Sequence, residues 1–184
     1  MTTAPKDRIR REMLLRLRAL SAAYVQAASA RLRELLRPLL AGCRHVCLYA
    51  PLAHEVNVLP LLSEAPECSF YFPRCLPGRR MSFQRVQNPD RELIPGEMGI
   101  RKPLSALPAI EPSEVDLMVL PGLAFEPLSG GGATRLGYGG GYYDRYLPLL
   151  PPTARTVALA LPEQIITDLP TEAHDTPVQT LLTL

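Results

Sequence analysis

The sequence has no apolar run long enough to span a bilayer, and no hydrophobic signal region near its first residues. Its formal net charge of +2 argues neither for nor against a nucleic-acid partner. The four cysteines form no CxxC pair, which argues against a zinc site and predicts reduced thiols in or near a core: Cys43, Cys47, Cys68 and Cys75. These absences predict a cytoplasmic protein without a membrane partner.

The length and composition predict a single domain over residues 1–184. Hydrophobic residues make up 47% of the chain and charged residues 21%, which is typical of a globular protein. The twenty prolines are dense between Pro103 and Pro127, which indicates long ordered connections rather than a second domain.

Most of the basic excess lies in residues 1–37. A basic, helical start is compatible with an organelle transit peptide, although Asp7 and Glu12 are unusual for that class. It is also compatible with a nucleic-acid-binding module, although few aromatic residues interleave with the basic ones to stack on bases. We therefore expect no nucleic-acid partner.

The spacing of apolar residues predicts two helices at the start of the chain. The two periodic series are Ile9, Met13, Leu17 and Leu20, then Leu32, Leu35, Leu36, Leu39 and Leu40. Ser21 is the predicted N-cap of the second helix, and Gly42 is its predicted stop. Two further helices are expected, a short one over residues 58–65 and another from Tyr142 to Leu150.

Short apolar runs predict the strands. They are HVCLYAP (45–51), CSFYFP (68–73), MSFQRV (81–86), VDLMVLPG (115–122), TVALAL (156–161) and VQTLLTL (178–184). The run at 115–122 is the predicted central strand, and that at 81–86 lies nearer an edge. Strands separated by helical stretches predict the α/β class, a three-layer α/β/α fold with a largely parallel sheet, preceded by two N-terminal helices.

The stretch RLGYGGGYYDRY, Arg135 to Tyr146, combines glycines with tyrosine rings and charges. It has no lysine, which excludes a P-loop, and the pattern GxGxxG fails because Tyr142 occupies its last position. Three interpretations stay open: a flexible connector, a phosphate cradle, or a helix start in which Asp144 merely favours the helix dipole. The preceding SGGGAT (129–134) is interpreted as a linker or a mobile flap.

DLMVLPGLAFE (116–126) and RLGYGGGYYDRYL (135–147) resemble the signature of the 5-formyltetrahydrofolate cyclo-ligase family, also called 5,10-methenyltetrahydrofolate synthetase. Other stretches agree in order and approximate spacing: KDRIR (6–10), YAPLAHEV (49–56), YFPR (71–74) with MSF (81–83), and LPTEAHD (169–175). Differences are Glu126 in place of a usual aspartate, Asn57 after EV, Lys102 in GIRKP, and the insertion at 129–134.

The resemblance implies an enzyme that uses ATP and Mg²⁺ to convert 5-formyltetrahydrofolate to 5,10-methenyltetrahydrofolate, with release of ADP and phosphate. The formyl oxygen would be phosphorylated first, and ring closure would then expel phosphate. The expected partners are these two substrates, and the expected assembly is a monomer or weak dimer. The alternative is a non-catalytic relative that binds nucleotide or folate.

The resemblance also implies roles for individual residues. The implied catalytic residues are Arg135, Tyr143 and Asp144, and the implied magnesium ligands are Asp144 and Asp175. The implied ATP-binding residues are Lys6, Arg10, Arg135, Leu136, Gly137, Tyr138, Gly139, Gly140, Gly141, Tyr142 and Tyr143. The implied folate-binding residues are Ala50, Glu55, Tyr138, Gly139, Gly140, Gly141 and Tyr142.

Without the resemblance, several of these residues have simpler interpretations. Lys6 and Arg10 lie four positions apart, on one face of the first predicted helix, and would form a solvated basic surface. Glu55 would be an ordinary loop acid after a strand. Asp175 would be a polar residue before the last strand, and His174 beside it is interpreted as structural.

Overall fold

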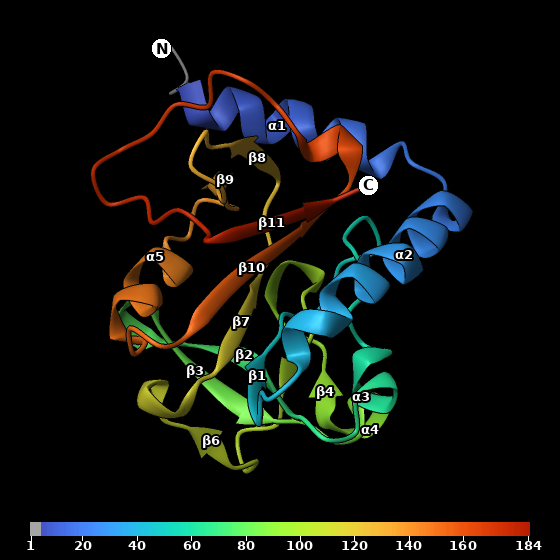
Figure 1. Ribbon diagram of the computed structural model, residues 1–184, viewed down its shortest axis with the longest axis vertical. Coiled ribbons are helices and arrows are strands. Elements are labelled where there is room, and N and C mark those ends of the chain that lie inside the picture. Colours follow the sequence, from blue (N-terminus) through green and yellow to red (C-terminus); the bar gives the residue numbers. More distant parts are fainter. Residues whose placement is uncertain (1–4) are drawn as a thin grey trace.

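The computed structural model describes residues 5–184 and is built around a seven-stranded sheet (Figure 1). The strand order is β11-β10-β7-β1-β2-β3-β6, formed by Thr180–Thr183, Arg155–Ala160, Leu117–Leu120, His45–Cys47, Ser69–Leu76, Arg80–Arg85 and Ala109–Ile110. The first five strands in this order are mutually parallel, β3 runs antiparallel to β2, and β6 runs antiparallel to β3 and so in the direction of the first five. The predicted largely parallel sheet is confirmed, with β7 in its interior.

Two long helices precede the sheet, as predicted. The α-helices are α1 (Pro5–Arg18), α2 (Ala22–Leu40), α3 (Leu61–Glu64), α4 (Pro89–Glu92) and α5 (Tyr142–Tyr146). The Oγ atom of Ser21 accepts a hydrogen bond from the backbone N of Tyr24 at 3.2 Å, so the predicted N-cap of α2 is confirmed. Among the helices of residues 5–184, none combines the length and the apolar character needed to cross a membrane.

The strand residues alternate between two apolar layers, one on each face of the sheet. On one face, Leu117 and Val119 of β7 share a cluster with residues of α1 and α2. On the other face, Met118 and Leu120 share a second cluster with residues of α5 and of the neighbouring hairpin. Figure 1 shows α2 and α5 on opposite sides of the sheet. The predicted three-layer arrangement is confirmed.

The connection between β7 and α5 differs from the prediction. It contains an antiparallel hairpin of β8 (Ala124–Pro127) and β9 (Ala133–Leu136), and the glycine-rich stretch follows β9 rather than β7. SGGGAT, interpreted as a linker or flap, supplies the hairpin turn and the first residues of β9. The predicted helix at 142–150 is shorter, because α5 gives way to a 3₁₀ turn at Leu147–Leu149.

Several small elements have no counterpart in the sequence prediction. Strands β4 (Leu93–Ile94) and β5 (Lys102–Pro103) form a separate antiparallel pair. The other 3₁₀ turns lie at Pro77–Arg79, Glu97–Gly99, Pro112–Glu114 and Pro162–Gln164. Figure 1 shows α1 beside the β8–β9 hairpin, at the end of the molecule opposite β6. This arrangement brings the first helix to the glycine-rich stretch.

Candidate functional site

A cavity of about 480 Å³ lies where β1 and β7 end. Its wall contains Tyr49 and Ala50, which follow β1, and Pro121, which follows β7. The first turns of α1, the glycine loop (Gly137–Gly141), the segment Gly96–Lys102 and the segment before β11 complete the wall. Ligands of open α/β sheets bind at this edge, and the volume is within the usual range for ligand sites.

The structure brings every predicted site residue to this cavity. The lining includes Lys6, Arg10, Ala50, Glu55, Arg135, Leu136, Gly137, Tyr138, Gly139, Gly140, Gly141, Tyr142, Tyr143, Asp144 and Asp175. The sequence interpretation missed other lining residues, among them Cys75, Met98, Arg101 and Lys102. Lys102 was marked only as a difference from the family pattern, and Cys75, which was expected in or near a core, is exposed.

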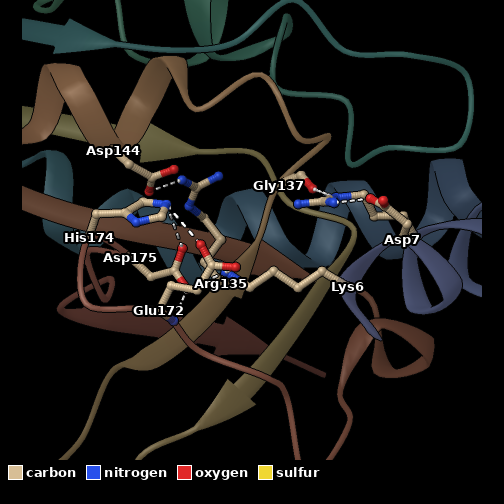
Figure 2. Close-up of polar contacts among 9 residues, drawn as sticks. Lys6, Asp7, Arg135, Gly137, Asp144, Glu172, His174 and Asp175 are labelled. Atoms are coloured by element: carbon tan, nitrogen blue, oxygen red, sulfur yellow. Dashed lines mark hydrogen bonds and ion pairs between the residues drawn. The ribbon is translucent and has the colours of Figure 1, made fainter. Parts of the chain in front are cut away.

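Lys6 connects α1 to the segment before β11. Its Nζ lies 2.6 Å from Oδ2 of Asp175 and 3.5 Å from Oε1 of Glu172. Figure 2 shows Lys6 extending from α1 to these carboxylates. The side chains of Lys6 and Asp175 are only 12% and 15% exposed, so the interpretation of Lys6 as part of a solvated basic surface is wrong. His174, interpreted as structural, is 70% exposed and lines the cavity.

Asp175 is held in its ionised form. Partial burial raises the pKa of Asp175, whereas the hydrogen bonds from Lys6 and from the backbone N of Glu172 lower it. The hydrogen bonds and the charge of Lys6 together outweigh burial, so the net pKa is below the ordinary value. The carboxylate is therefore charged at neutral pH, although its positive partner neutralises much of that charge.

Arg135 joins β9 to α5 through a buried guanidinium. Its Nη2 donates to Oδ1 of Asp144 at 2.9 Å, and its Nη1 donates to the carbonyl of Pro121 at 3.2 Å. The guanidinium carbon lies 5.4 Å from the ring centroid of Tyr143, within the range of a cation–π contact. Its Nε is buried and has no hydrogen-bond partner within residues 5–184. This donor is available to a ligand or a water molecule.

The glycine loop packs closely against charged and aromatic side chains. Gly139 and Gly141 have φ angles of 98° and 64°, in the left-handed region that favours glycine. A Cβ at Gly140 would lie 2.7 Å from the ring of Tyr142. Arg10 fixes the backbone from the side of α1, because its Nε donates to the carbonyl of Gly137 at 3.0 Å. The loop is therefore a shaped wall of the cavity rather than a free connector.

Glu55 lies at another part of the same cavity and is almost completely buried. Its Oε1 accepts a 2.6 Å hydrogen bond from the hydroxyl of Tyr138, and its Oε2 accepts one from the backbone N of Leu52 at 2.8 Å. Burial raises its pKa, while these two hydrogen bonds lower it, and the net shift is upward. Glu55 is thus not the ordinary loop acid that its local sequence suggests.

These features define an α/β protein in which a basic helix, a glycine loop and paired carboxylates meet at the carboxyl edge of a parallel sheet. Residues 2–184 match the sequence model of the 5-formyltetrahydrofolate cyclo-ligase family, so the chain belongs to that family. The protein is accordingly an enzyme of the cyclo-ligase type.

Individual relatives agree with this assignment. The chain is 28% identical over its full length to a 5-formyltetrahydrofolate cyclo-ligase of Mycolicibacterium smegmatis, covering 95% of that protein. It is 30% identical to a probable 5-formyltetrahydrofolate cyclo-ligase of Schizosaccharomyces pombe, over 77% of this chain and 75% of the relative. The solved structure of Aquifex aeolicus 5,10-methenyltetrahydrofolate synthetase is similar with a TM-score of 0.81 at 32% identity, over 97% of this chain and 89% of that one.

Proposed function

We propose that the protein converts 5-formyltetrahydrofolate to 5,10-methenyltetrahydrofolate, consuming ATP with Mg²⁺ and releasing ADP and phosphate. One observation carries this proposal: three cations and two carboxylates surround the glycine loop in a single cavity. They are Lys6, Arg10, Arg135, Asp144 and Asp175. Such a set suits phosphoryl transfer, which asks a protein mainly to position charged groups and to neutralise developing charge.

The nucleotide is assigned to the part of the cavity formed by α1, the glycine loop and α5. Lys6, Arg10 and Arg135 supply positive charge for its phosphates, and the backbone of Gly139 to Gly141 permits close approach. Each of these cations already contacts a carboxylate. A bound phosphate would therefore replace or share these carboxylate partners, and it would not have to order a free side chain. Leu136, Tyr142 and Tyr143 complete this wall.

Mg²⁺ fits the oxygen donors of Asp144 and Asp175. One oxygen of each carboxylate contacts a cation, Oδ1 of Asp144 with Arg135 and Oδ2 of Asp175 with Lys6, and the other oxygen of each can accept a metal. Within residues 5–184, no three His, Cys, Asp or Glu side chains are grouped as a metal cage. Two carboxylates suit a magnesium ion that also binds the nucleotide phosphates, and the ion would neutralise charge on the transferring group.

Folate is assigned to the part of the cavity around Ala50 and Glu55. The carboxylate of Glu55 can accept hydrogen bonds from the amino and ring N–H groups of a pterin. Tyr138 and Tyr142 supply aromatic surface, and the phosphate-binding cations line the same cavity. Because both parts belong to one cavity, the formyl oxygen would meet the γ-phosphate within it, with no protein backbone between the reacting atoms.

The reaction then proceeds in two steps. The formyl oxygen attacks the γ-phosphorus, a new O–P bond forms, and the bond to ADP breaks. The neighbouring anilino nitrogen attacks the formyl carbon, loses its proton, and the carbon–oxygen bond breaks to release phosphate. Arg135, oriented by its ion pair with Asp144, holds the transferring group in position, and Tyr143 supports the guanidinium of Arg135 through its ring.

An absorbance assay tests the proposal. Incubation with 5-formyltetrahydrofolate and MgATP should yield the methenyl chromophore at a rate proportional to protein concentration. No product at high protein concentration would overturn the activity. In that case, a retained increase in melting temperature with MgATP or with folate would identify a non-catalytic binding protein.

The metal assignment has its own test. MgATP should raise the melting temperature by mass action, and ATP with EDTA should raise it much less. Equal shifts with and without the metal would remove Asp144 and Asp175 from this role. The cytoplasmic location, the monomeric or weakly dimeric state and the lack of a nucleic-acid partner stay predictions.

A further inference from the structure

A single phenol joins the two parts of the cavity. We propose that the hydroxyl of Tyr138 couples folate binding at Glu55 to the conformation of the nucleotide loop, and that His54 is the positioning residue that orients this hydroxyl. The identities of the two ligands rest on the proposed function. The coupling itself rests on contacts among Glu55, Tyr138, His54 and Arg10.

The hydrogen-bond chain has a defined direction. Glu55 accepts the hydroxyl hydrogen of Tyr138 at 2.6 Å, and a phenol has only one hydrogen to donate. The Nε2 atom of His54 lies 3.2 Å from the same hydroxyl oxygen, so it must carry a hydrogen and donate it. The order is therefore His54 to Tyr138 to Glu55. The side chain of His54 fixes where the phenol hydrogen points.

All three groups are held by their surroundings. Glu55 is 6% exposed and His54 is 9% exposed, so solvent offers few substitutes for their hydrogen bonds. The second oxygen of Glu55 is occupied by the backbone N of Leu52, which fixes the carboxylate plane. A change in the position of Glu55 is thus transmitted to the ring of Tyr138.

The ring of Tyr138 in turn fixes the glycine loop. Tyr138 lies between Gly137, whose carbonyl accepts a hydrogen bond from Arg10, and Gly139, whose φ is 98°. The next two residues are also glycines, which impose little conformational restriction of their own. The loop backbone is therefore held at neighbouring residues by α1 on one side and by Glu55 on the other.

This arrangement predicts positive coupling between the two ligands. Folate bound at Glu55 would add hydrogen bonds to the carboxylate and reduce the remaining motion of Tyr138 and of the loop, so the nucleotide would lose less conformational entropy when it binds. By linkage, the nucleotide would tighten folate binding by the same factor. Without the hydroxyl of Tyr138, each ligand would bind independently of the other.

The coupling is measurable by calorimetry with a non-hydrolysable ATP analogue, Mg²⁺ and 5-formyltetrahydrofolate. For the unmodified protein, folate should tighten the Kd of the analogue by at least about fivefold, a typical size for coupling between sites. Tyr138→Phe should reduce this ratio to about one. His54→Leu should reduce it in the same direction, and His54→Gln, whose amide N–H can donate in place of Nε2, should restore most of it.

A double variant separates positioning from a general structural role. If His54 acts through the phenol, His54→Leu should leave the Kd ratio unchanged in a Tyr138→Phe background. A ratio that moves away from one in the double variant, or a full ratio in Tyr138→Phe, would overturn the inference. Independent binding of both ligands to the unmodified protein would overturn it too, yet leave the proposed function intact. Failure to bind either ligand would reject the proposed function and the inference together.

Discussion

Two glycine-rich segments lie close together in the sequence but differ in what surrounds them. In the hairpin turn, a Cβ at Gly130 or Gly131 would meet no atom within 4 Å. In the glycine loop, a Cβ at Gly139 would lie 3.3 Å from the guanidinium of Arg10, and one at Gly140 would lie 2.7 Å from Tyr142. The turn uses Gly131 for backbone direction and Gly132 for close approach to the Val178 carbonyl, away from the cavity, whereas the loop uses glycine to keep the cavity wall free of side chains.

Gly140→Val should have the largest effect, because a branched side chain would displace Tyr142 and fill the wall that approaches the phosphates. Turnover should fall by at least roughly a hundredfold, which corresponds to about 2.7 kcal/mol of transition-state stabilisation. The far-UV spectrum and most of the stability should be kept. Near-normal turnover would mean that this loop does not hold the phosphates.

Gly130→Val is the matched control for Gly140→Val, and it should leave both turnover and stability nearly unchanged. Neither position has a positive φ, and Gly130 faces open space. Gly131 is a poorer control, because its φ of 92° would strain any other residue. Equal losses in both variants would remove the distinction between the two segments.

Arg10→Ala should raise the KM for ATP by about tenfold, in line with the loss of one charge-assisted contact of about 1.4 kcal/mol. The substitution removes the hydrogen bond to Gly137 and the side chain that packs on Gly139. Arg8→Ala is the control, since Arg8 is on the same helix but is 70% exposed and pairs only with Glu12. Similar KM values in both variants would show that Arg10 makes no specific contact with the nucleotide.

Gly132→Ala should reduce stability without affecting the site. Gly132 has a φ of 74°, and a Cβ there would overlap the carbonyl oxygen of Val178. Strain of this kind costs about 1–3 kcal/mol, which corresponds to a fall in melting temperature of several degrees. Steady-state kinetics at a temperature where the variant is folded should give an unchanged KM for ATP. A large rise in that KM would show that the turn is part of the site.

The smallest predicted effect concerns the other anchor of the loop, Glu55. Because burial raises its pKa, protonation should begin above the ordinary value of about 4.3, and a protonated carboxyl accepts pterin hydrogen bonds less well. Folate affinity should therefore weaken several-fold as pH falls from 8 toward that value. The pH dependence of the folate Kd should be measured by calorimetry for the unmodified protein and for Glu55→Gln. The difference between the two curves is the contribution of the Glu55 carboxyl. Identical pH profiles for the two proteins would contradict the assignment.

Local sequence patterns predicted the elements whose stability depends on nearby residues. The periodicity of α2 and its Ser21 cap, and the apolar run of β7, are local features, and the structure confirms them. The hairpin escaped prediction because its strands have only four residues each and lack a clear alternation. The composition of SGGGAT is equally typical of a linker and of a tight turn.

Among the site residues, those with a local sequence signal were predicted, and those that depend on distant partners were not. The glycine loop was recognisable from its own composition and from the family resemblance. The burial of Lys6 was not, because its partner Asp175 is 169 residues away in the sequence. Arg101 precedes the two-residue strand β5 and Lys102 begins it, and the pairing of so short a strand has no local signature. The family resemblance marked Lys102 only as a difference, so the sequence did not indicate that either residue lines the cavity.

The ion pair between Lys6 and Asp175 has a consequence for synthesis of the protein. A ribosome releases the first helix early, whereas the carboxylate that pairs with Lys6 emerges only after nearly all of the sheet. Until then, the nascent chain carries the cations proposed to bind the nucleotide without one of the two proposed metal ligands. The protein therefore becomes able to catalyse its reaction only at the end of translation. A chain that stalls before Asp175 would lack the partner of Lys6 and would be inactive.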